Sequence, residues 1–334
     1  MTRGTRAMHP HPTVGRRYTA ADHYEVGREK IRDFARAVQD FHPAHWDDGA
    51  ARELGHSGLL TPVTFASAVG SLTQRALMRA ALNGYDPAHL LHVEQDIHCH
   101  RPVTAGNRLT HEITVDSRRP TPGGDLIAVT MTIRDHTDAV VQTVHTTLAG
   151  RHHDTSPTVE ALAMLDLLER VPTPSRAALA QTITDPPPTR LDQYTAAAKL
   201  AVGQRFPPRT IRLSRGELVH YAGVSGDINP IHWHDAAARH AGLDAVAAHG
   251  MLTMGLGAAC LTQWLGVPDS VVNYYVQFAR PVLIAAHRPA EITFDGAVRS
   301  VDPATRQAVI SLTAHSADNS IFGLASATVH ADPR

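Results

Sequence analysis

The stretch "AGVSGDINPIHWHDAAARHAG" at 222–242 repeats an earlier one, "ARAVQDFHPAHWDDGAARELG" at 35–55. At a constant offset of 187, ten of the 21 positions are identical. An acid, a proline, a histidine and a tryptophan recur in both copies: Asp40 and Asp227, Pro43 and Pro230, His45 and His232, Trp46 and Trp233. A repeat at a fixed offset indicates two copies of one structural unit.

A second pair of matching blocks follows in the same order. The triplet "RPV" occurs at 101–103 and again at 280–282, and "EITVD" at 112–116 returns as "EITFD" at 291–295. Both pairs have an offset of 179. Two repeated blocks in one order predict an N-terminal domain over residues 1–150 and a C-terminal domain over residues 199–334.

The segment between the two predicted domains, residues 151–198, has a different composition. It contains Pro157, Pro172, Pro174 and a run of three prolines at 186–188. Proline lacks a backbone donor and blocks helix propagation, so we expect a semi-extended connector here rather than a third core.

Each copy has the same coarse layout, which is clearest in the second. A helix with Ser214 as its N-cap precedes the histidine loop, and "GMLTMGLGAACLTQWLG" at 250–266 then predicts a helix that is apolar nearly all round. Such a helix must be wrapped by protein. Alternating apolar and polar residues from 290 to 331 predict antiparallel strands. A buried helix wrapped by a long antiparallel sheet is an α+β hot-dog fold. Two copies predict a double hot-dog, packed as a pseudo-dimer.

The loop "SGDINPIHWHD" at 225–235 carries the chemistry. Pro230 fixes its own φ and biases Asn229 towards an extended conformation, so Asp227 and His232 can converge from either side of a turn. A carboxylate and an imidazole placed in this way can act as paired acid and base. Gly250 follows at the expected start of the buried helix, where unpaired N–H groups can receive a developing oxyanion. We expect β-elimination next to a carbonyl.

The same residues resemble a known family. "YAGVSGDINPIHWHD" at 221–235 with "AHGMLTMG" at 248–255 resembles the MaoC-like (R)-hydratase and dehydratase family. The C-terminal half, including "DGAVRSVDP" at 295–303, is similar to HadB-type subunits of (3R)-hydroxyacyl-ACP dehydratases, and the N-terminal half to HadA-type subunits. The chain thus resembles a fused HadA–HadB-type dehydratase.

The resemblance implies roles for five residues. His232 would remove the C2 proton of a 3-hydroxyacyl thioester, and Asp227 would act on the C3 hydroxyl. The Gly250 N–H would stabilise the thioester oxygen. Asn229 and His249 would support the loop. The resemblance implies acyl-ACP or acyl-CoA as substrate, an acyl carrier protein as partner, and neither cofactor nor metal.

The N-terminal copy departs from this pattern. Asp40 and His45 keep their spacing, but His42 replaces the asparagine, and Pro62 and Val63 stand where the second copy has His249 and Gly250. Proline supplies no N–H. We expect this half to be non-catalytic and to shape the acyl channel.

Other readings of the histidines remain open at this point. An inactive hot-dog protein that binds an acyl chain, a metal-dependent hydrolase and a thioesterase are the alternatives. "HWHD" at 232–235 begins like a metallo-hydrolase motif but lacks its final histidine, and "HCH" at 98–100 alternates in an expected strand. We also expect His234 or Asp235 to cap the following helix, because aspartate is a favoured N-cap.

Composition limits the partners and the compartment. The formal net charge is −1 and aromatic residues make up 5%, which argues against nucleic acid or a charged membrane surface. Cys99 and Cys260 lie far apart without metal-type spacing, which suits a reducing cytoplasm. No apolar run has the length of a membrane span, and the basic start lacks a secretory apolar region. We therefore expect a cytoplasmic protein, either a monomeric pseudo-dimer or a homodimer.

Overall fold

The computed structural model describes residues 13–20, 22–70, 85–152 and 200–331. The predicted connector therefore falls almost entirely outside the described residues. The elements of the N-terminal half are β1 (Arg17–Thr19), β2 (Tyr24–Glu25), α1 (Arg28–Ala37), η1 (Pro43–His45), α2 (Asp48–Glu53), η2 (Val63–Phe65), α3 (Ala66–Val69), β3 (Tyr85–Cys99), β4 (Arg108–Thr121), β5 (Gly124–Arg134) and β6 (Val140–His152).

The C-terminal half repeats this order of elements. Its elements are β7 (Arg209–Leu213), α6 (Arg215–Ser225), η3 (Pro230–His232), α7 (Asp235–His240), β8 (Val246–Ala247), α8 (Gly250–Leu265), β9 (Val271–Phe278), β10 (Leu283–Ile284), β11 (Ala290–Asp302), β12 (Gln307–Ser316), β13 (Asn319–Ser320) and β14 (Phe322–His330).

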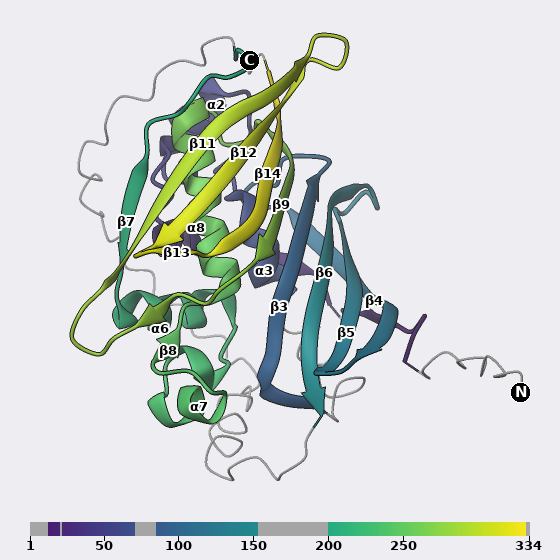
Figure 1. Cartoon of the computed structure of the whole chain (residues 1–334). Coiled ribbons are helices and arrows are strands. Elements are labelled where there is room, and N and C mark those ends of the chain that lie inside the picture. Colours follow the sequence, from purple (N-terminus) through teal and green to yellow (C-terminus); the bar gives the residue numbers. More distant parts are fainter. Residues whose placement is uncertain (1–12, 21, 71–84, 153–199, 332–334) are drawn as a thin grey trace, which may run out of the picture.

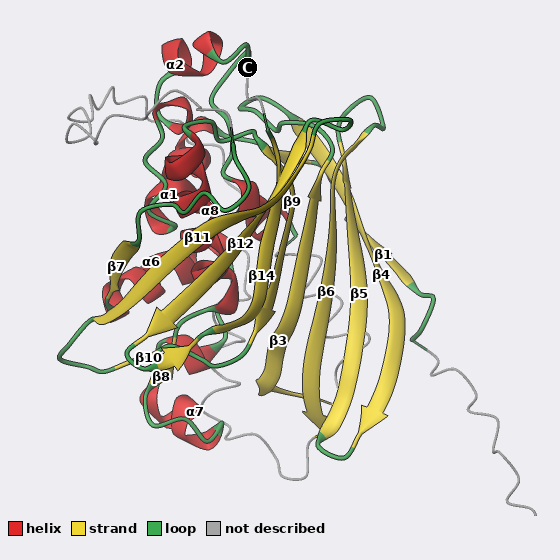
Figure 2. Ribbon diagram, turned by 45° about the horizontal axis from the view of Figure 1, so that its top comes forward, coloured by secondary structure: helices red, strands yellow, loops and turns green. Residues whose placement is uncertain are grey.

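One antiparallel sheet runs through both halves. Its strand order is β1-β4-β5-β6-β3-β9-β14-β12-β11-β7, and the short strands β2 and β13 pair with β4 and β12 respectively. The halves meet where β3 pairs with β9, in a register that places Glu94 opposite Gln277 and His98 opposite Asn273. Figure 2 shows this seam near the middle of the sheet. The double hot-dog prediction is confirmed.

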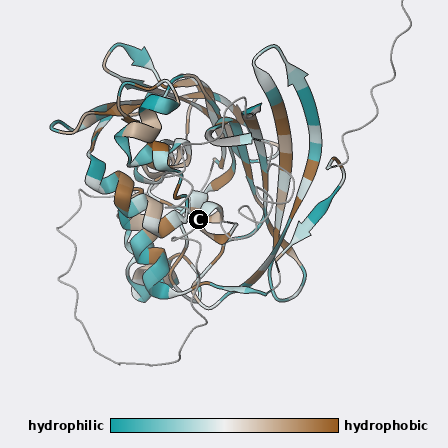
Figure 3. Ribbon diagram, turned by 90° about the horizontal axis from the view of Figure 1, so that it is seen from below, coloured by the Kyte–Doolittle hydropathy of each residue, from teal (hydrophilic) through white to brown (hydrophobic). Residues whose placement is uncertain are grey.

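The long apolar helix is enclosed by the C-terminal part of the sheet. Thirteen of the sixteen residues of α8 are buried, and Figure 1 shows β11, β12, β14 and β9 curving around it. The predicted alternation is seen in β12, where every second residue from Ala308 to Ala314 is buried. In Figure 3 hydrophobic and hydrophilic segments accordingly follow one another along the strands. Burial of this alternating face against the helix forms the core.

The helices that precede the two histidine loops pack against each other. The rings of Phe34 on α1 and Tyr221 on α6 lie 6.1 Å apart, and Lys30 donates a hydrogen bond to the carbonyl of Val224. The start of α6 is the predicted one: Glu217 accepts a hydrogen bond from the backbone N–H of Ser214 in a capping box. Because the start of α1 contacts the end of α6, the two helices run antiparallel and the loops that follow them begin at opposite ends of the pair.

Of the two residues expected to cap α7, His234 occupies the N-cap position. The His234 side chain accepts the hydrogen bond from the Ala237 N–H at 3.3 Å. Asp235 is instead the first helical residue and pairs with Arg215 at 2.7 Å. A carboxylate in the first turn still favours the helix electrostatically. None of the helices described is both long enough and apolar enough to cross a membrane.

Candidate active site

The loop after α6 is built by local backbone chemistry. Gly226 ends the helix in the left-handed region at φ +78°, a conformation that glycine adopts without strain. The Asp227 N–H then donates to Ser225 Oγ at 3.2 Å, and Asp227 Oδ1 accepts from the Asn229 N–H at 3.2 Å. The Asn229 side chain in turn accepts from the Ile231 N–H and caps η3. Asn229 therefore orders the loop, as the resemblance implies.

His232 is held in one orientation by a backbone carbonyl. Its Nδ1 lies 2.8 Å from the carbonyl oxygen of Ala247 on β8. A carbonyl only accepts, so Nδ1 carries the proton and Nε2 presents its lone pair. Nε2 lies 3.9 Å from Asp227 Oδ2. An oxygen at about 2.8 Å from both atoms fits between them, at an angle of about 90°. The pair can therefore hold one water molecule or one hydroxyl group.

The charges of this pair are set by burial and by the neighbouring imidazoles. Burial lowers the pKa of His232 below its ordinary value, and the Asp227 charge and the Ala247 carbonyl only partly oppose this. Burial raises the pKa of Asp227, but His232, His249 and His92 outweigh burial and lower it overall. At neutral pH the site holds a carboxylate and a neutral imidazole, which are both bases.

Gly250 lies at the start of α8, as predicted. His249 precedes the helix in an extended conformation, with φ −59° and ψ 133°, and the Gly250 N–H has no acceptor within the described residues. First-turn N–H groups lack partners inside their own helix. A methyl group added at Gly250 would lie 3.4 Å from the ring of Phe278 and 3.7 Å from His92 Cβ. The Cα of Gly250, next to this free N–H, therefore lies against Phe278 and His92.

The N-terminal copy reproduces the backbone of this site closely. His45 Nδ1 lies 2.8 Å from the carbonyl oxygen of Leu60, which is the counterpart of Ala247 at the same offset of 187. Gln39, the counterpart of Gly226, also has a positive φ of 52°. His42 accepts from the Ala44 N–H and so replaces Asn229 as the cap of η1. The repeat is thus a repeat of geometry as well as of sequence.

The two acid–histidine pairs differ in their access to solvent. The side chains of His45 and Asp40 are 0% and 4% exposed, against 9% and 39% for His232 and Asp227. His42 Nε2 donates to the carbonyl of Gly266 at the end of α8, which closes this side. Val63 stands in place of Gly250: it keeps a backbone N–H, but it is buried and its side chain restricts approach to that N–H. The N-terminal pair is therefore closed to solvent and lacks the open approach that glycine gives at position 250.

Comparisons with known proteins agree with this layout. Residues 12–144 match the FAS1-like dehydratase domain region, and residues 197–318 match the MaoC like domain. A UPF0336 protein of Streptomyces griseus is 42% identical over 141 residues, which are 41% of this chain and 92% of that protein. A solved structure of a MaoC-like dehydratase is 39% identical, with a TM-score of 0.81, over 96% of this chain and 98% of that one. This chain belongs to the MaoC-like dehydratase family.

More distant structures share the fold of this MaoC-like protein. HtdX of Mycobacterium tuberculosis is 19% identical, with a TM-score of 0.61, over 94% of this chain and 99% of that one. Another M. tuberculosis protein, described as a double hot-dog, is 16% identical with a TM-score of 0.62, over 95% and 96% of the two chains. The family places the chain among hydratases and dehydratases.

His249 packs against the pair formed by Asp227 and His232. It is fully buried, its ring stacks on that of His232 with centroids 3.7 Å apart, and its Nε2 donates to the backbone carbonyl of Asp227 at 3.1 Å. Burial, together with the neighbouring His232, lowers its pKa to about 3. The ring is therefore neutral and contacts both catalytic candidates, His232 by stacking and Asp227 by the hydrogen bond.

The geometry of these three residues does not suit a metal ion. Among the described residues, Asp227, His232 and His249 are the one group whose potential ligand atoms lie within 4.8 Å of one another. However, the two rings are nearly parallel, with an interplanar angle of 26°. Planes so inclined and spaced meet about 8 Å from the ring centres, whereas a bound zinc lies in each ring plane about 2 Å from nitrogen. The two lone pairs therefore cannot converge on one ion.

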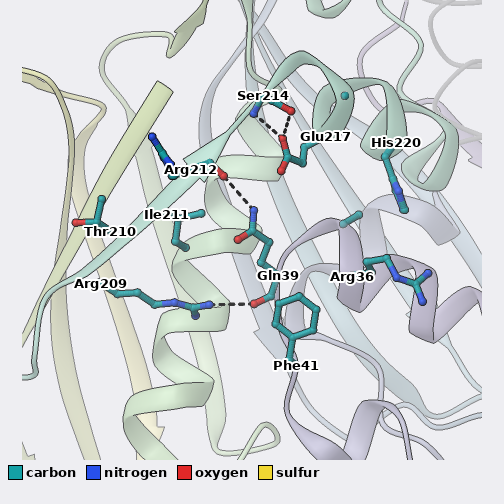
Figure 4. A pocket seen from close by; sticks show the side chains of 12 residues that line it. Arg36, Gln39, Phe41, Arg209, Thr210, Ile211, Arg212, Ser214, Glu217 and His220 are labelled. Carbon is teal, nitrogen blue, oxygen red and sulfur yellow. Dashed lines mark hydrogen bonds between the residues drawn. The ribbon is translucent and has the colours of Figure 1, made fainter. Parts of the chain in front are cut away.

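A separate open cavity of about 780 Å³ lies between α1, β7 and the start of α6. Figure 4 shows Arg36, Arg209 and Arg212 around it. These arginines are already engaged: with Asp33 at 3.0 Å, the Gln39 carbonyl at 3.2 Å and Glu291 at 3.2 Å respectively. The cavity is lined by Gln39 and Phe41 beside the N-terminal pair, and its lining includes none of Asp227, His232 and His249. It is not part of the candidate active site.

Two features of the site were missed by sequence reasoning. The Ala247 carbonyl that fixes His232 is a backbone group, so no residue type marks it in the sequence. Its distance along the chain from His232 is the same as that of Leu60 from His45, and this spacing could have indicated it. His92 and Phe278 come from β3 and β9, and their approach to Gly250 depends on the pairing of the two halves. Neither strand carries a motif that predicts this contact.

Proposed function

We propose that this chain is a (3R)-hydroxyacyl-thioester dehydratase, which acts in reverse as a trans-2-enoyl-thioester hydratase. The observation that carries the proposal is the joint placement of Asp227, His232 and the free Gly250 N–H, with a gap of 3.9 Å between the two bases. The first two are the proposed catalytic residues, and Asn229 and His249 position them. The reaction uses these groups alone and no cofactor.

The chemistry follows from the protonation state of the pair. In hydration, a water molecule donates one hydrogen bond to the Asp227 carboxylate and one to His232 Nε2. Nε2 takes a proton from the water as the water oxygen bonds to C3, and the C2=C3 electron pair moves towards the thioester carbonyl. The Gly250 N–H stabilises the negative oxygen. The imidazolium then protonates C2, so that one water has been added.

Dehydration is the same path in reverse. Neutral His232 removes the C2 proton, and the imidazolium returns it to the C3 hydroxyl, which leaves as water. Asp227 stabilises the imidazolium and holds the hydroxyl, but as a carboxylate it has no proton to donate. Asp227 thus acts on the hydroxyl by accepting a hydrogen bond from it.

We propose that Arg280 binds the carrier of the acyl chain. This exposed arginine follows β9 two residues after Phe278, and it has no ion-pair partner among the described residues. Its repeat counterpart, Arg101, faces Asp135 at 3.8 Å. An unpaired cation near the site suits an acyl carrier protein or the phosphates of coenzyme A. A chain with both hot-dogs can supply this site as a monomer.

The experiment is hydration of trans-2-enoyl thioesters of increasing length, on coenzyme A and on acyl carrier protein, followed by loss of enoyl absorbance. Wild type is compared with Asp227→Asn, with and without EDTA. We expect a (3R)-hydroxyacyl product, loss of rate in the variant and no effect of EDTA. Tight acyl-thioester binding without hydration on either carrier would instead support an acyl-binding protein.

A further inference from the structure

The N-terminal half supplies a histidine to the C-terminal site. His92 lies on β3, just before the seam with β9 that begins at Glu94 and Gln277. Its ring meets that of Phe278 edge-on, with centroids 6.4 Å apart and an angle of 65°. Its Cβ lies 3.7 Å from where a methyl group at Gly250 would be. The pairing of the two halves therefore brings His92 to the first residue of α8.

The ring of His92 is electrostatically part of the site. It is half-buried, and its nitrogens have no hydrogen-bond partner among the described residues. Burial lowers its pKa, the Asp227 charge opposes this, and the His232 charge adds to it. The imidazole is therefore mainly neutral at pH 7, with one N–H still to be satisfied. A half-buried donor without an acceptor is suited to bind a group that arrives with the substrate.

We propose that His92 is a third residue of the active site, whose imidazole donates a hydrogen bond to the acyl oxygen of the thioester beside the Gly250 N–H. The inference rests on the proposed function. When C2 is protonated or deprotonated, negative charge develops on that oxygen, and two fixed donors stabilise it better than one. The non-catalytic half then completes the oxyanion site of the other half, as well as enclosing the acyl chain.

The test compares His92→Ala and His92→Gln, because glutamine keeps an N–H donor at a similar distance. We expect His92→Ala to lower kcat for crotonyl-CoA hydration by about 10²-fold with KM little changed, and His92→Gln to recover most of the rate. His98→Ala is the matched control: His98 lies on the same strand and contacts Asn273 across the same seam. We expect it to keep the wild-type rate. Wild-type kcat in His92→Ala, or no recovery in a folded His92→Gln, would overturn the proposal.

A second readout does not depend on turnover. The carbonyl stretch of bound butyryl-CoA, which cannot react, is measured by difference Raman spectroscopy. We expect His92→Ala to move this band back towards its frequency in solution, and His92→Gln to leave it near that of wild type. An unchanged band in His92→Ala refutes the contact. If wild type hydrates no thioester but the carbonyl band of its bound butyryl-CoA is shifted from the solution frequency, the proposed function is refuted and the contact is not.

Discussion

At the scale of single residues, the free donor at Gly250 can be tested without breaking α8. Proline is well tolerated at the first helical position, and the extended conformation of His249 is the one that precedes proline. Gly250→Pro removes the N–H and keeps the helix, whereas Gly250→Ala keeps the N–H. We expect Gly250→Pro to lower kcat by about 10²–10³-fold, and clearly more than Gly250→Ala. Equal rates in the two variants would show that the N–H is not used.

The pH dependence of the rate follows from His232. Its pKa lies below the ordinary value of 6.5, so the ring is neutral at pH 7 and becomes protonated only in more acidic solution. As pH falls below 6.5, Nε2 loses its lone pair to a proton and can no longer receive one from water. We therefore expect kcat/KM for hydration to be level near pH 7 and to fall on the acid side. A rate that rises as pH falls through this range would contradict a neutral His232.

Single residues also show what the sequence could predict. The acid, the histidine and the glycine were found because they share a short motif whose chemistry is local. His92 was not found, because its role depends on a strand pairing between residues 94–98 and 273–277. The difference between the two copies was predicted from His42, Pro62 and Val63. The unequal exposure of the two acid–histidine pairs is a property of the packed molecule.

At the scale of elements, α8 carries glycines where the N-terminal half approaches it. A methyl group at Gly255 would lie 2.6 Å from Val38 Cγ1 and 3.1 Å from Thr64 Oγ1. Gly223, on the exposed side of α6, has nothing within 4 Å of the same position. We expect Gly255→Ala to lower the free energy of unfolding by about 1–3 kcal/mol, and Gly223→Ala to raise it by about 0.5–1 kcal/mol. Urea unfolding measures both, and equal effects would contradict this packing.

The helices and strands of the C-terminal half could be predicted because their patterns are strong. Residues 250–266 are apolar all round, and the following strands alternate regularly. The N-terminal half was read through the repeat alone, and some positions that correspond to α8 at the offset of 187 fall within 71–84, outside the described residues. The cap of α7 shows the limit of such rules: propensity favours aspartate as an N-cap, but of the two candidates it is His234 that occupies the position.

At the scale of the whole molecule, buried neutral histidines make stability depend on pH. Burial lowers the pKa of His249 to about 3 and that of His42 to about 4, in both cases with help from a neighbouring histidine. The unfolded chain binds these protons near pH 6.5 and the folded chain does not, so stability falls as pH drops below 6.5. At pH 5 each such residue costs about 2 kcal/mol. The raised pKa of His45 acts in the opposite direction.

His42→Asn tests this linkage, because it gives the N-terminal loop the cap residue of the C-terminal one. We expect the loss of unfolding free energy between pH 7 and pH 5 to be smaller in this variant than in wild type. Urea unfolding at both pH values measures the difference. The same loss in both proteins would mean that His42 does not resist protonation in the folded state.

The whole molecule is best described as one sheet with two copies of a site, of which one is open. The most direct test of this claim makes the same substitution in each copy, His232→Gln and His45→Gln, and measures the initial rate of crotonyl-CoA hydration beside thermal unfolding. The account predicts a loss of about 10²–10⁴-fold for His232→Gln and a wild-type rate for folded His45→Gln. Equal losses in two folded variants, or a loss confined to His45→Gln, would contradict it.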